Sequence, residues 1–459
     1  MLPEVSMHED GRIALLTLGL DQNAAVLVVG MGKTGYSVGR FLARQGIRFA
    51  VTDSRPSPPF LSEFTREFPE AAVFPGGFQS AAFEAATHLV VSPGVSLDEP
   101  AIVDAIYRGV QVLGDLDLFA CMARAPIVAV TGANGKSTVT TLVGMMAQAA
   151  GLNARVGGNL GTPMLDLLDD AAEIYVLELS SFQLETSRVM DAVAATVLNI
   201  SPDHMDRYDG IQEYADTKKR IFHGTGIRVL NLDDPMVEAM AEDAAREVWF
   251  SVEKQANYCL DMRSGEEWLV CQGEPLMRCA EVRLKGRHNL ANALAALALG
   301  DAAGFSRAAM ISSLRQFEGL EHRMQCVGEI NGVIWINDSK ATNVGACMAA
   351  LSGLSGQVVL IAGGDGKGAD FRVLRPVVEQ KVKAAVLMGR DAGLLESALG
   401  DLVPVVRVNA MREAVRAASR LAEPGDVVLL APACASLDQY KDYQERGRMF
   451  VKEMRGLAS

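Results

Sequence analysis

The stretch VAVTGANGKSTVT, residues 128–140, decides the fold. It joins an apolar run to a long helical pattern, with TGANGKST at residues 131–138 between them. Glycines let backbone N–H groups curl around a phosphate, the start of a helix adds positive potential, and Lys136 can reach the outer phosphates of a nucleotide. The hydroxyl of Ser137 can bind a magnesium ion. The stretch therefore predicts a strand, a phosphate-binding loop and a helix, which are parts of an α/β domain.

Two features around this loop bear on its interpretation. The general P-loop pattern has a further glycine where this sequence has Val130, so the loop is a shortened variant. A strand–turn–helix corner that carries Gly-Lys-Ser by chance is the alternative, and the flanking patterns favour the phosphate loop. Glu178 ends the apolar run of YVLELSS, where a P-loop site has a metal-binding carboxylate. Glu178 alone could be a solvated acid, but beside this loop a metal ligand is favoured.

A second glycine-rich loop precedes the first. VVGMGKTGYSVGR, residues 28–40, follows an apolar run, and the next strand-like run ends on Asp53. This is the arrangement of a dinucleotide-binding turn with its ribose-binding acid. The motif alone is compatible with a nicotinamide-dependent oxidoreductase, with another diphosphate ligand, or with a turn that binds nothing.

Strand-like runs alternate with helical patterns along most of the chain, which indicates α/β layers with mainly parallel sheets. The series restarts at APIVAVTG and again after GLEHRM. We therefore predict an α/β protein of three domains: an N-terminal Rossmann-like domain (1–112), a central P-loop ATP-binding domain (113–319) and a C-terminal Rossmann-like domain (320–459). Domain closure about a hinge near GLEHRM is expected.

Composition limits the class of protein. The 459 residues are 49% hydrophobic and 22% charged, with a net charge of −13, which disfavours a nucleic-acid binder. No apolar run reaches the roughly 18 residues that span a bilayer. The first ten residues, MLPEVSMHED, lack the pattern of a secretory signal. The seven cysteines are scattered without a C-x-x-C pair, so we expect a reduced, cytoplasmic protein that associates with neither nucleic acid nor membrane.

Further motifs extend the pattern along nearly the whole chain: GGNLGTP, NISPDHMDRY, YADTKKRIF, GRHNLANALAA, GLEHRM, NDSKATN, IAGGDGKGADF and APACASLDQYKDYQERG. In this order and spacing the sequence resembles the Mur ligases, and most closely those members that add D-glutamate to UDP-N-acetylmuramoyl-L-alanine. The resemblance implies an ATP-dependent ligase of peptidoglycan precursor synthesis, a monomer that works through an acyl phosphate and a tetrahedral intermediate and releases ADP and phosphate. It also implies that the first loop holds uridine diphosphate.

The resemblance implies three sets of binding residues. The UDP-sugar is expected to contact Lys33, Thr34, Asp53, Ser54, Gly94, Asn159 and His204. ATP is expected to contact Thr131, Gly132, Ala133, Asn134, Gly135, Lys136, Ser137 and Thr138, together with Asn292, Arg323 and Asp338. D-Glutamate is expected to contact Thr342, Lys367, Ser436, Leu437 and Tyr443. The family often has phenylalanine where Tyr443 stands, and either residue supplies an aromatic wall.

The resemblance also implies the catalytic residues Lys136, Glu178, His204 and Lys218 and two magnesium sites. The first magnesium would lie near Ser137 and Glu178, and the second near His204 and a carbamate on Lys218. The family's spacing from a tyrosine and an arginine selects Lys218 rather than Lys219. An ammonium group has no lone pair for a cation, whereas a carbamate offers the oxygen ligands that magnesium prefers.

Several alternatives remain open at this stage. A diaminopimelate-adding Mur ligase should show a D-x-P-R motif in the third domain, where NDSKATN and SLDQYKDY stand instead. A folylpolyglutamate synthetase would lack the N-terminal GMGKTG domain. A nicotinamide-dependent oxidoreductase leaves Lys136, Glu178 and two domains unexplained. A non-enzymatic nucleotide-binding regulator would need no amino-acid pocket.

Overall fold

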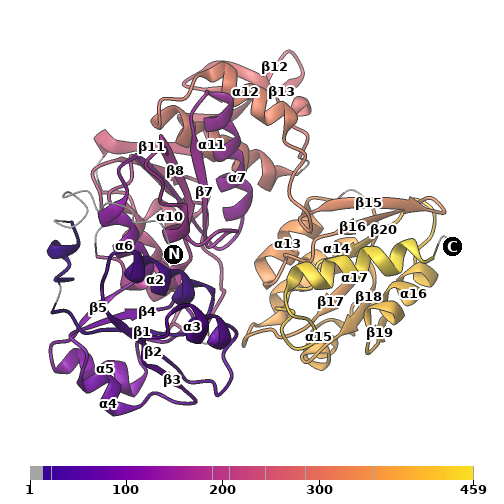
Figure 1. Cartoon of the computed structure of the whole chain (residues 1–459). Helices are drawn as coiled ribbons and strands as arrows, with labels where there is room; N and C mark the ends of the chain where they lie inside the picture. Colours follow the sequence, from indigo (N-terminus) through magenta and orange to yellow (C-terminus); the bar gives the residue numbers. More distant parts are fainter. Residues whose placement is uncertain are drawn as a thin grey trace.

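The computed structural model describes residues 14–457 except 22, 189, 206, 243, 285 and 355. Its strands form three separate sheets that follow one another along the chain, each with helices packed on it (Figure 1). The protein is therefore α/β with three sheets, as the sequence predicts. The residues weighed for a secretory signal lie outside the described part. No helix in the described part is both long and apolar enough to cross a membrane.

The first sheet is parallel and has the order β3-β2-β1-β4-β5. Alternate residues of β1 face two different cores, because side chains of a strand point to opposite faces in turn. The carboxyl ends of β1, β2 and β4 meet at one edge, which carries the first glycine-rich loop. The elements are β1 (Val26–Val29), α2 (Lys33–Arg44), β2 (Phe49–Asp53), α3 (Leu61–Glu67), β3 (Val73–Pro75), α4 (Ser80–Glu84), β4 (His88–Val91), α5 (Pro100–Tyr107) and β5 (Gln111–Leu113).

The second sheet has nine strands in the order β14-β13-β12-β11-β10-β9-β6-β8-β7. Strands β6 to β12 form the parallel part of this sheet, in which β6 lies between β8 and β9. Strands β13 and β14 continue it beyond β12 with antiparallel pairing. One face packs on α7, α11 and α12, and the other shares its core with the first domain. The helices are α6 (Asp115–Met122), α7 (Lys136–Ala149), α8 (Ser181–Thr186), α9 (Ile211–Lys219), α10 (Pro235–Glu238), α11 (Arg287–Ala302) and α12 (Arg307–Gln316). The strands are β6 (Ile127–Thr131), β7 (Ala154–Gly158), β8 (Ile174–Glu178), β9 (Ala194–Val197), β10 (Ile227–Asn231), β11 (Glu247–Ser251), β12 (Tyr258–Arg263), β13 (Glu266–Cys271) and β14 (Glu274–Arg278).

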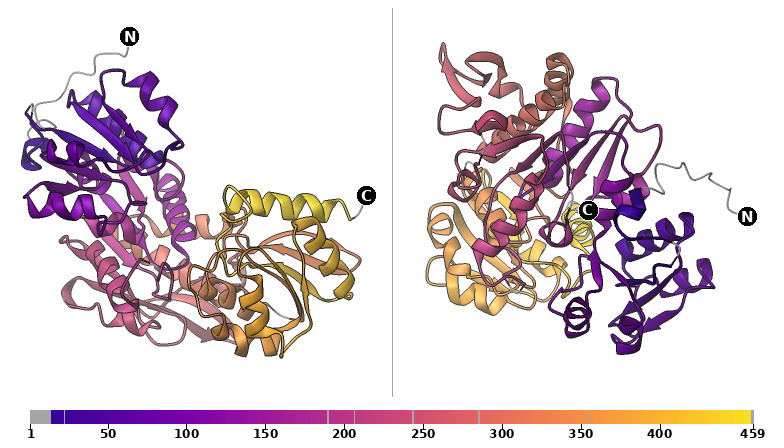
Figure 2. Two further views of the ribbon diagram at one scale, coloured as in Figure 1. Left: turned by 90° about the horizontal axis from the view of Figure 1, so that it is seen from below. Right: turned by 90° about the vertical axis from the view of Figure 1, so that its left-hand side faces the viewer.

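The third sheet has the order β15-β16-β20-β17-β18-β19 and is parallel except for the edge strand β15. One face packs on α13, α14 and α15, and the other on α16 and α17 (Figure 2). The strands are β15 (Gln325–Ile330), β16 (Val333–Asn337), β17 (Val358–Gly363), β18 (Val382–Met388), β19 (Val405–Arg407) and β20 (Val427–Leu430). The helices are α13 (Val344–Ser352), α14 (Arg375–Lys381), α15 (Ala392–Leu399), α16 (Met411–Leu421) and α17 (Tyr443–Arg455).

Short single-turn helices complete the described chain. They are η1 (Met164–Leu167), η2 (Arg220–Phe222), η3 (Ala244–Arg246), η4 (Cys279–Glu281) and η5 (Phe371–Leu374). The domain limits at 112 and 319 stay predictions. The first of them falls within β5, and the second lies between the end of α12 and the start of β15.

Candidate active site

The phosphate loop lies between β6 and α7, at the carboxyl edge of the second sheet. Gly135 has φ of 83°, and a Cβ there would lie 2.5 Å from Oδ1 of Asn292. A side chain at this position would therefore be strained and would collide with α11. The ammonium of Lys136 donates to the carbonyls of Gly132 and Ala133 at 2.9 and 2.8 Å. Burial lowers the pKa of Lys136, and the nearby Glu178 partly offsets this effect.

Glu178 ends β8 beside the phosphate loop and is buried. Its Oε1 accepts a hydrogen bond of 2.6 Å from Nδ2 of Asn159. Its Oε2 is buried and accepts no hydrogen bond of standard geometry from the described residues, although the Ser137 hydroxyl is near. Burial favours the neutral acid, but Lys136 and Ser137 outweigh it and hold the pKa of Glu178 below its usual value. Glu178 thus has one oxygen fixed by Asn159 and a second that accepts no hydrogen bond of standard geometry from the described residues.

The structure separates the two candidate lysines of α9. Lys218 is 1% exposed, and its amine donates to Oγ1 of Thr131 at 3.3 Å and lies 4.6 Å from the ring centre of Tyr214. Lys219 points elsewhere and pairs with Glu242 at 2.5 Å. Burial and the neighbouring Lys136 lower the pKa of Lys218 well below its ordinary value. A buried lysine whose neighbouring carboxylates do not offset the cost of burying its charge favours the neutral amine.

A cavity of about 300 Å³ brings these groups together with the third domain. Its lining from the central domain comprises the phosphate loop with Glu178, Asp203, His204 and Lys218 among others. The third sheet and the segment leading into it contribute Arg323, Lys340, Thr342, Asn343 and Lys367. Residues far apart in sequence therefore face one space. Arg323 already contacts the loop, because its Nη2 donates to the Ser137 hydroxyl at 2.6 Å.

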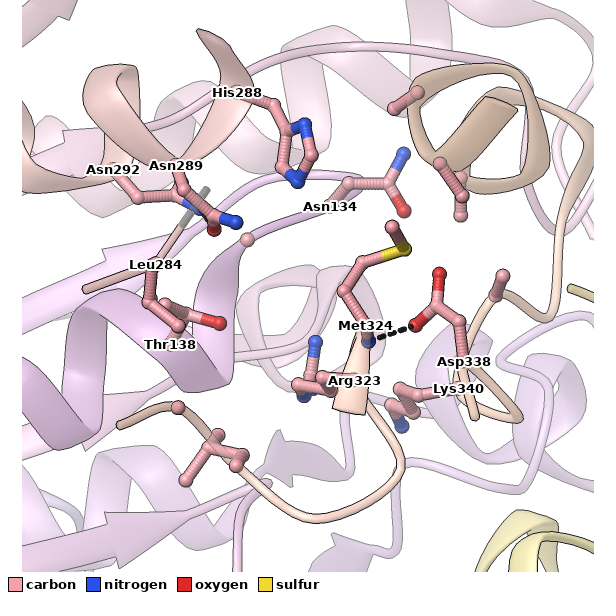
Figure 3. Close-up of a pocket in the computed structure, with 17 residues that line it drawn as sticks. Asn134, Thr138, Leu284, His288, Asn289, Asn292, Arg323, Met324, Asp338 and Lys340 are labelled. Atoms are coloured by element: carbon pink, nitrogen blue, oxygen red, sulfur yellow. Dashed lines mark hydrogen bonds between the residues drawn. The ribbon is translucent and has the colours of Figure 1, made fainter. Parts of the chain in front are cut away.

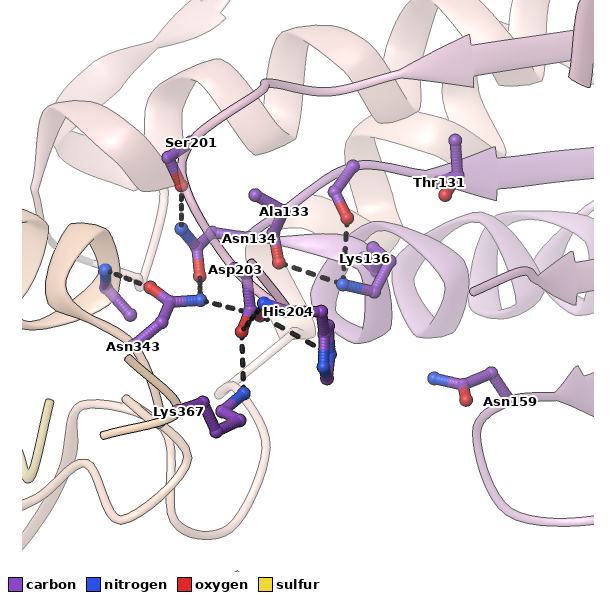
Figure 4. A network of polar contacts seen from close by, with 12 residues as sticks. Thr131, Ala133, Asn134, Lys136, Asn159, Ser201, Asp203, His204, Asn343 and Lys367 are labelled. Atoms are coloured by element: carbon purple, nitrogen blue, oxygen red, sulfur yellow. Dashed lines mark hydrogen bonds and ion pairs between the residues drawn. The ribbon is translucent and has the colours of Figure 1, made fainter. Parts of the chain in front are cut away.

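A polar network crosses from the central to the third domain at this cavity (Figure 4). Lys367 donates to Oδ1 of Asp203 at 2.6 Å, and Asn343 donates to Oδ2 at 3.1 Å. Asn343 also donates to Oδ1 of Asn134 in the phosphate loop, at 3.4 Å. Burial opposes ionisation of Asp203, but His204 and Lys367 lower its pKa to about 2. Asp203 and Asn343 were not singled out from the sequence, although SPDHMD and NDSKATN contain them.

A second, narrower pocket of about 90 Å³ lies between the phosphate loop, α11 and the third sheet (Figure 3). Asn289 and Asn292 line it from α11, with a hydrogen bond of 3.2 Å between their side chains. Arg323 and Asp338 line it from the other side. Oδ1 of Asp338 accepts the backbone N–H of Met324 at 3.1 Å, and burial raises the pKa of Asp338 to about 6. The predicted nucleotide contacts outside the loop therefore share one pocket, and His288 and Leu284, which sequence reasoning missed, line it too.

The five residues expected at D-glutamate divide into two groups. Thr342 and Lys367 line the cavity of about 300 Å³. Ser436, Leu437 and Tyr443 do not line it and lie on the loop before α17 and at its first residue. Ser436 is buried and Leu437 is 72% exposed. Tyr443 is linked to the cavity through Lys340, whose amine lies 4.2 Å from its ring centre.

Arg446 of α17 organises the loops behind this pocket. Its buried guanidinium donates to the carbonyls of Ser339 and Cys434 at 2.8 and 3.1 Å. Two loops from different strands of the third sheet are thereby held together. Sequence reasoning did not single out Arg446, because an arginine in a helix pattern gives no sign that it is buried.

The predicted UDP-sugar contacts of the first domain lie at the carboxyl edge of the first sheet, whereas Asn159 and His204 line the cavity of about 300 Å³. Asp53 is buried, and its carboxylate accepts the N–H of Met31 at 2.7 Å and two hydrogen bonds from Arg55 at 2.8 and 2.7 Å. Arg55, which sequence reasoning missed, is half exposed at this edge. Lys33 reaches across to the central domain and donates to the carbonyl of Gly161 at 2.5 Å. Asp53 thus already serves to fix the loop and Arg55, and its contact with a nucleotide stays a prediction.

Within the described ranges, no group of three or more His, Cys, Asp or Glu side chains is arranged to hold a metal ion. Magnesium usually keeps several water ligands and is bound through one or two carboxylates together with substrate phosphates.

Comparisons with known proteins agree with this architecture. Models of the Mur ligase MurD-like N-terminal domain, the Mur ligase middle domain and the Mur ligase glutamate ligase domain match residues 24–114, 130–300 and 322–434. The fold and these matches are those of a three-domain ATP-dependent ligase, and the chain belongs to the Mur ligase family.

Curated relatives indicate which member of the family is most relevant. The UDP-N-acetylmuramoylalanine--D-glutamate ligase of Methylococcus capsulatus is 60% identical over 454 residues, covering 98% of this chain and 99% of that protein. The enzyme of the same name from Pseudomonas aeruginosa is 52% identical over 438 residues, covering 94% and 98%.

Solved structures share the fold at lower identity. UDP-N-acetylmuramate-alanine ligase MurC from Thermotoga maritima superposes with a TM-score of 0.60 at 20% identity, covering 95% of this chain and all of the other. MurF from Acinetobacter baumannii gives a TM-score of 0.60 at 17% identity, covering 96% and 92%. At these identities the likeness concerns the fold alone.

Proposed function

We propose that the protein is an ATP-dependent ligase that joins D-glutamate to UDP-N-acetylmuramoyl-L-alanine in peptidoglycan precursor synthesis. One observation carries the proposal: a single cavity is lined by the phosphate loop, by Glu178 and by Lys367 of the third domain. A nucleotide phosphate, a carboxylate to be activated and an amino acid can therefore meet in one space. The relatives that match almost the whole chain are named for this activity.

The reaction requires activation, because a carboxylate does not react with an amine unaided. The γ-phosphoryl group of ATP is transferred to the alanyl carboxylate, which gives an acyl phosphate and ADP. The uncharged amine of D-glutamate attacks the carbonyl carbon, and the tetrahedral intermediate collapses with cleavage of the C–O bond to phosphate. The products are the amide, ADP and phosphate, and the attacking amine releases one proton because the amide nitrogen keeps a single N–H.

The residues of the chain contribute mainly charge and position, as phosphoryl transfer between anions demands. Lys136 lies at the phosphate loop, and Arg323 reaches Ser137 from the other side of the cavity. Lys340 lines both the cavity and the nucleotide pocket, and burial lowers its pKa to about 8. These cations face the space in which negative charge accumulates during transfer.

Two magnesium sites are part of the proposal. The first would be held by Ser137 and Glu178, and the second by His204 and a carbamate on Lys218. The buried Oε2 of Glu178, without a hydrogen bond of standard geometry from the described residues, fits the first site. The buried amine of Lys218 fits the second, since a neutral amine reacts with carbon dioxide. Bound magnesium would neutralise charge on the transferred phosphoryl group.

Carbon-13 NMR tests the modification directly. After equilibration with labelled bicarbonate, we expect a carbamate signal in the unchanged protein and in Lys219→Ala, because Lys219 points away from the cavity and pairs with Glu242. The signal should be absent from Lys218→Ala. A signal that survives in Lys218→Ala would contradict the assignment to Lys218.

The substrate sites follow from the same geometry. Uridine diphosphate would lie at the carboxyl edge of the first sheet, against Lys33, Thr34, Ser54 and Gly94, where the N-terminus of α2 favours phosphate. The sugar and its alanyl group would extend past Asn159 and His204 toward the phosphate loop. We also propose Asp53 as a contact of the nucleotide.

The other substrates occupy the remaining predicted positions. ATP would bind along residues 131–138 and reach Asn292, Arg323 and Asp338 in the narrow pocket. D-Glutamate would bind Thr342 and Lys367, with Ser436, Leu437 and Tyr443 completing its pocket when the substrates are bound.

We further propose that the enzyme acts in the cytoplasm as a monomer, with domains at 1–112, 113–319 and 320–459. All seven cysteines lie in the described part of the chain and are free thiols, which is the usual state in a reducing compartment. The three separate sheets support the division into three domains.

Phosphate release from ATP tests the proposed function. The assay contains UDP-N-acetylmuramoyl-L-alanine and magnesium, with D-glutamate, L-glutamate, L-lysine, meso-diaminopimelate or L-alanine in separate reactions. We expect release with D-glutamate alone. Release with another amino acid would support a ligase activity but overturn the assignment of the amino-acid pocket to D-glutamate. No release with any of them would contradict the proposed function.

A further inference from the structure

Asp203 is a carboxylate of the central domain that accepts hydrogen bonds from two residues of the third domain. It follows β9 in the chain, and its two oxygens accept hydrogen bonds from Lys367 at 2.6 Å and Asn343 at 3.1 Å. Its side chain is 11% exposed, and that of Lys367 is 19% exposed. This contact joins the central domain to the residue proposed to bind D-glutamate.

The backbone on both sides of the contact is fixed in an unusual conformation. His204 and Lys367 have φ of 58° and 52°, in the left-handed region that residues other than glycine seldom adopt. The N–H of His204 donates to Oδ1 of Asp203 at 3.0 Å, and that of Lys367 donates to Asp365 at 3.1 Å. Such conformations persist where the surroundings determine them, and they are frequent at functional sites. The two turns are therefore set so that Asp203 and Lys367 meet.

Glu178 and Asp203 both line the cavity, and their contacts differ. Glu178 is fixed by Asn159 at the phosphate loop, whereas Asp203 contacts the amino-acid side of the cavity. The ammonium of Lys367 has three N–H donors, of which Asp203 takes one. The remaining two can face a carboxylate in the cavity.

We propose that Asp203 is a positioning residue for amino-acid binding, which holds Lys367 so that its remaining donors face a carboxylate of D-glutamate. The inference rests on the proposed function. Asn343 binds the second oxygen of Asp203 and also contacts Asn134 of the phosphate loop, so the contact forms when the third domain lies against the nucleotide site.

Steady-state kinetics of Asp203→Asn test this inference. Replacing a charged hydrogen bond by a neutral one should raise the KM for D-glutamate about tenfold. The KM for ATP and the kcat at saturating D-glutamate should stay near those of the unchanged protein, and Asp203→Glu should restore part of the lost affinity. The matched control is Asp401→Asn, which removes an exposed pair with Arg375 within the third domain and should change neither constant.

A double-mutant cycle shows whether Asp203 acts through Lys367. In a Lys367→Ala background, Asp203→Asn should have no further effect on the KM for D-glutamate. The inference would be overturned if the effects of the two substitutions on the KM for D-glutamate were additive. It would also be overturned if Asp203→Asn raised the KM for ATP equally or left the KM for D-glutamate unchanged. None of these outcomes would contradict the proposed ligase activity. If the unchanged protein releases no phosphate with D-glutamate, the proposed function fails and the inference fails with it.

Discussion

Replacement of Gly135 by alanine perturbs the phosphate loop at its tightest point. Alanine at φ of 83° costs about 1 kcal/mol, since the left-handed conformation brings Cβ against the backbone. The new Cβ would lie 2.5 Å from Oδ1 of Asn292, so that side chain must move and its hydrogen bond to Asn289 is lost. That loss adds about 1 kcal/mol, for a total of about 2 kcal/mol in the free energy of unfolding. Because Gly135 and Asn292 both line the pocket proposed for the nucleotide, we expect the KM for ATP to rise by about tenfold or more.

Gly151→Ala is the matched control for this prediction. Gly151 follows α7, has φ of 87°, and has open space where a Cβ would stand. The substitution should lower the free energy of unfolding by about 1 kcal/mol, which corresponds to a fall of roughly 2–4 °C in the unfolding midpoint for a domain of this size. It should leave the KM for ATP unchanged. Thermal unfolding and steady-state kinetics of both variants provide the comparison. An equal KM for ATP in the two variants would refute the close approach of Gly135 to Asn292 as a determinant of nucleotide binding.

Three further predictions concern the amino-acid pocket, a buried acid and the metal. Lys367→Ala removes a charged hydrogen bond of about 2 kcal/mol, so the KM for D-glutamate should rise about 30-fold. Calorimetry should show that the variant still binds ATP. Unchanged D-glutamate kinetics would refute the assignment of Lys367 to the amino-acid pocket. Burial raises the pKa of Asp115 to about 6, so the folded state binds its proton more tightly than the unfolded state and stability falls as pH rises from about 4 through 6. Asp115→Asn should remove up to about 3 kcal/mol of that fall in urea unfolding, and an unchanged pH dependence would show that Asp115 is not its source. Removal of magnesium with a chelator should abolish phosphate release and leave the unfolding midpoint of the nucleotide-free protein unchanged, and a lowered midpoint would assign the metal a structural role.

The parts of the fold that could be predicted from sequence are those with local signals. The phosphate loop has glycine, lysine and serine in fixed order between a strand pattern and a helix pattern, and the structure has that loop between β6 and α7. The three series of strand-like runs correspond to the three sheets. The antiparallel extension of β12, β13 and β14 was not predicted, because its position depends on pairing with β11 rather than on local pattern.

The parts that could not be predicted depend on contacts between distant residues. Nothing local shows that Asp203 would meet Lys367, since 164 residues separate them. Lys218 and Lys219 are adjacent in one helix, and only the packing of α9 shows that the first is buried and the second paired with Glu242. The bidentate contact of Arg55 with Asp53 is local by contrast, and it depends on the conformation of the turn between these two residues.

The route taken by one oxygen atom tests the central claim, that ATP activates the alanyl carboxylate by transfer of its γ-phosphoryl group. UDP-N-acetylmuramoyl-L-alanine labelled with oxygen-18 in that carboxylate is incubated with the protein, ATP, magnesium and D-glutamate, and the products are analysed by mass spectrometry. We expect one labelled oxygen in each inorganic phosphate formed, because the C–O bond of the acyl phosphate breaks when the amine attacks. Label in AMP, or unlabelled phosphate alongside the amide product, would contradict the acyl-phosphate route and the role proposed for the cavity.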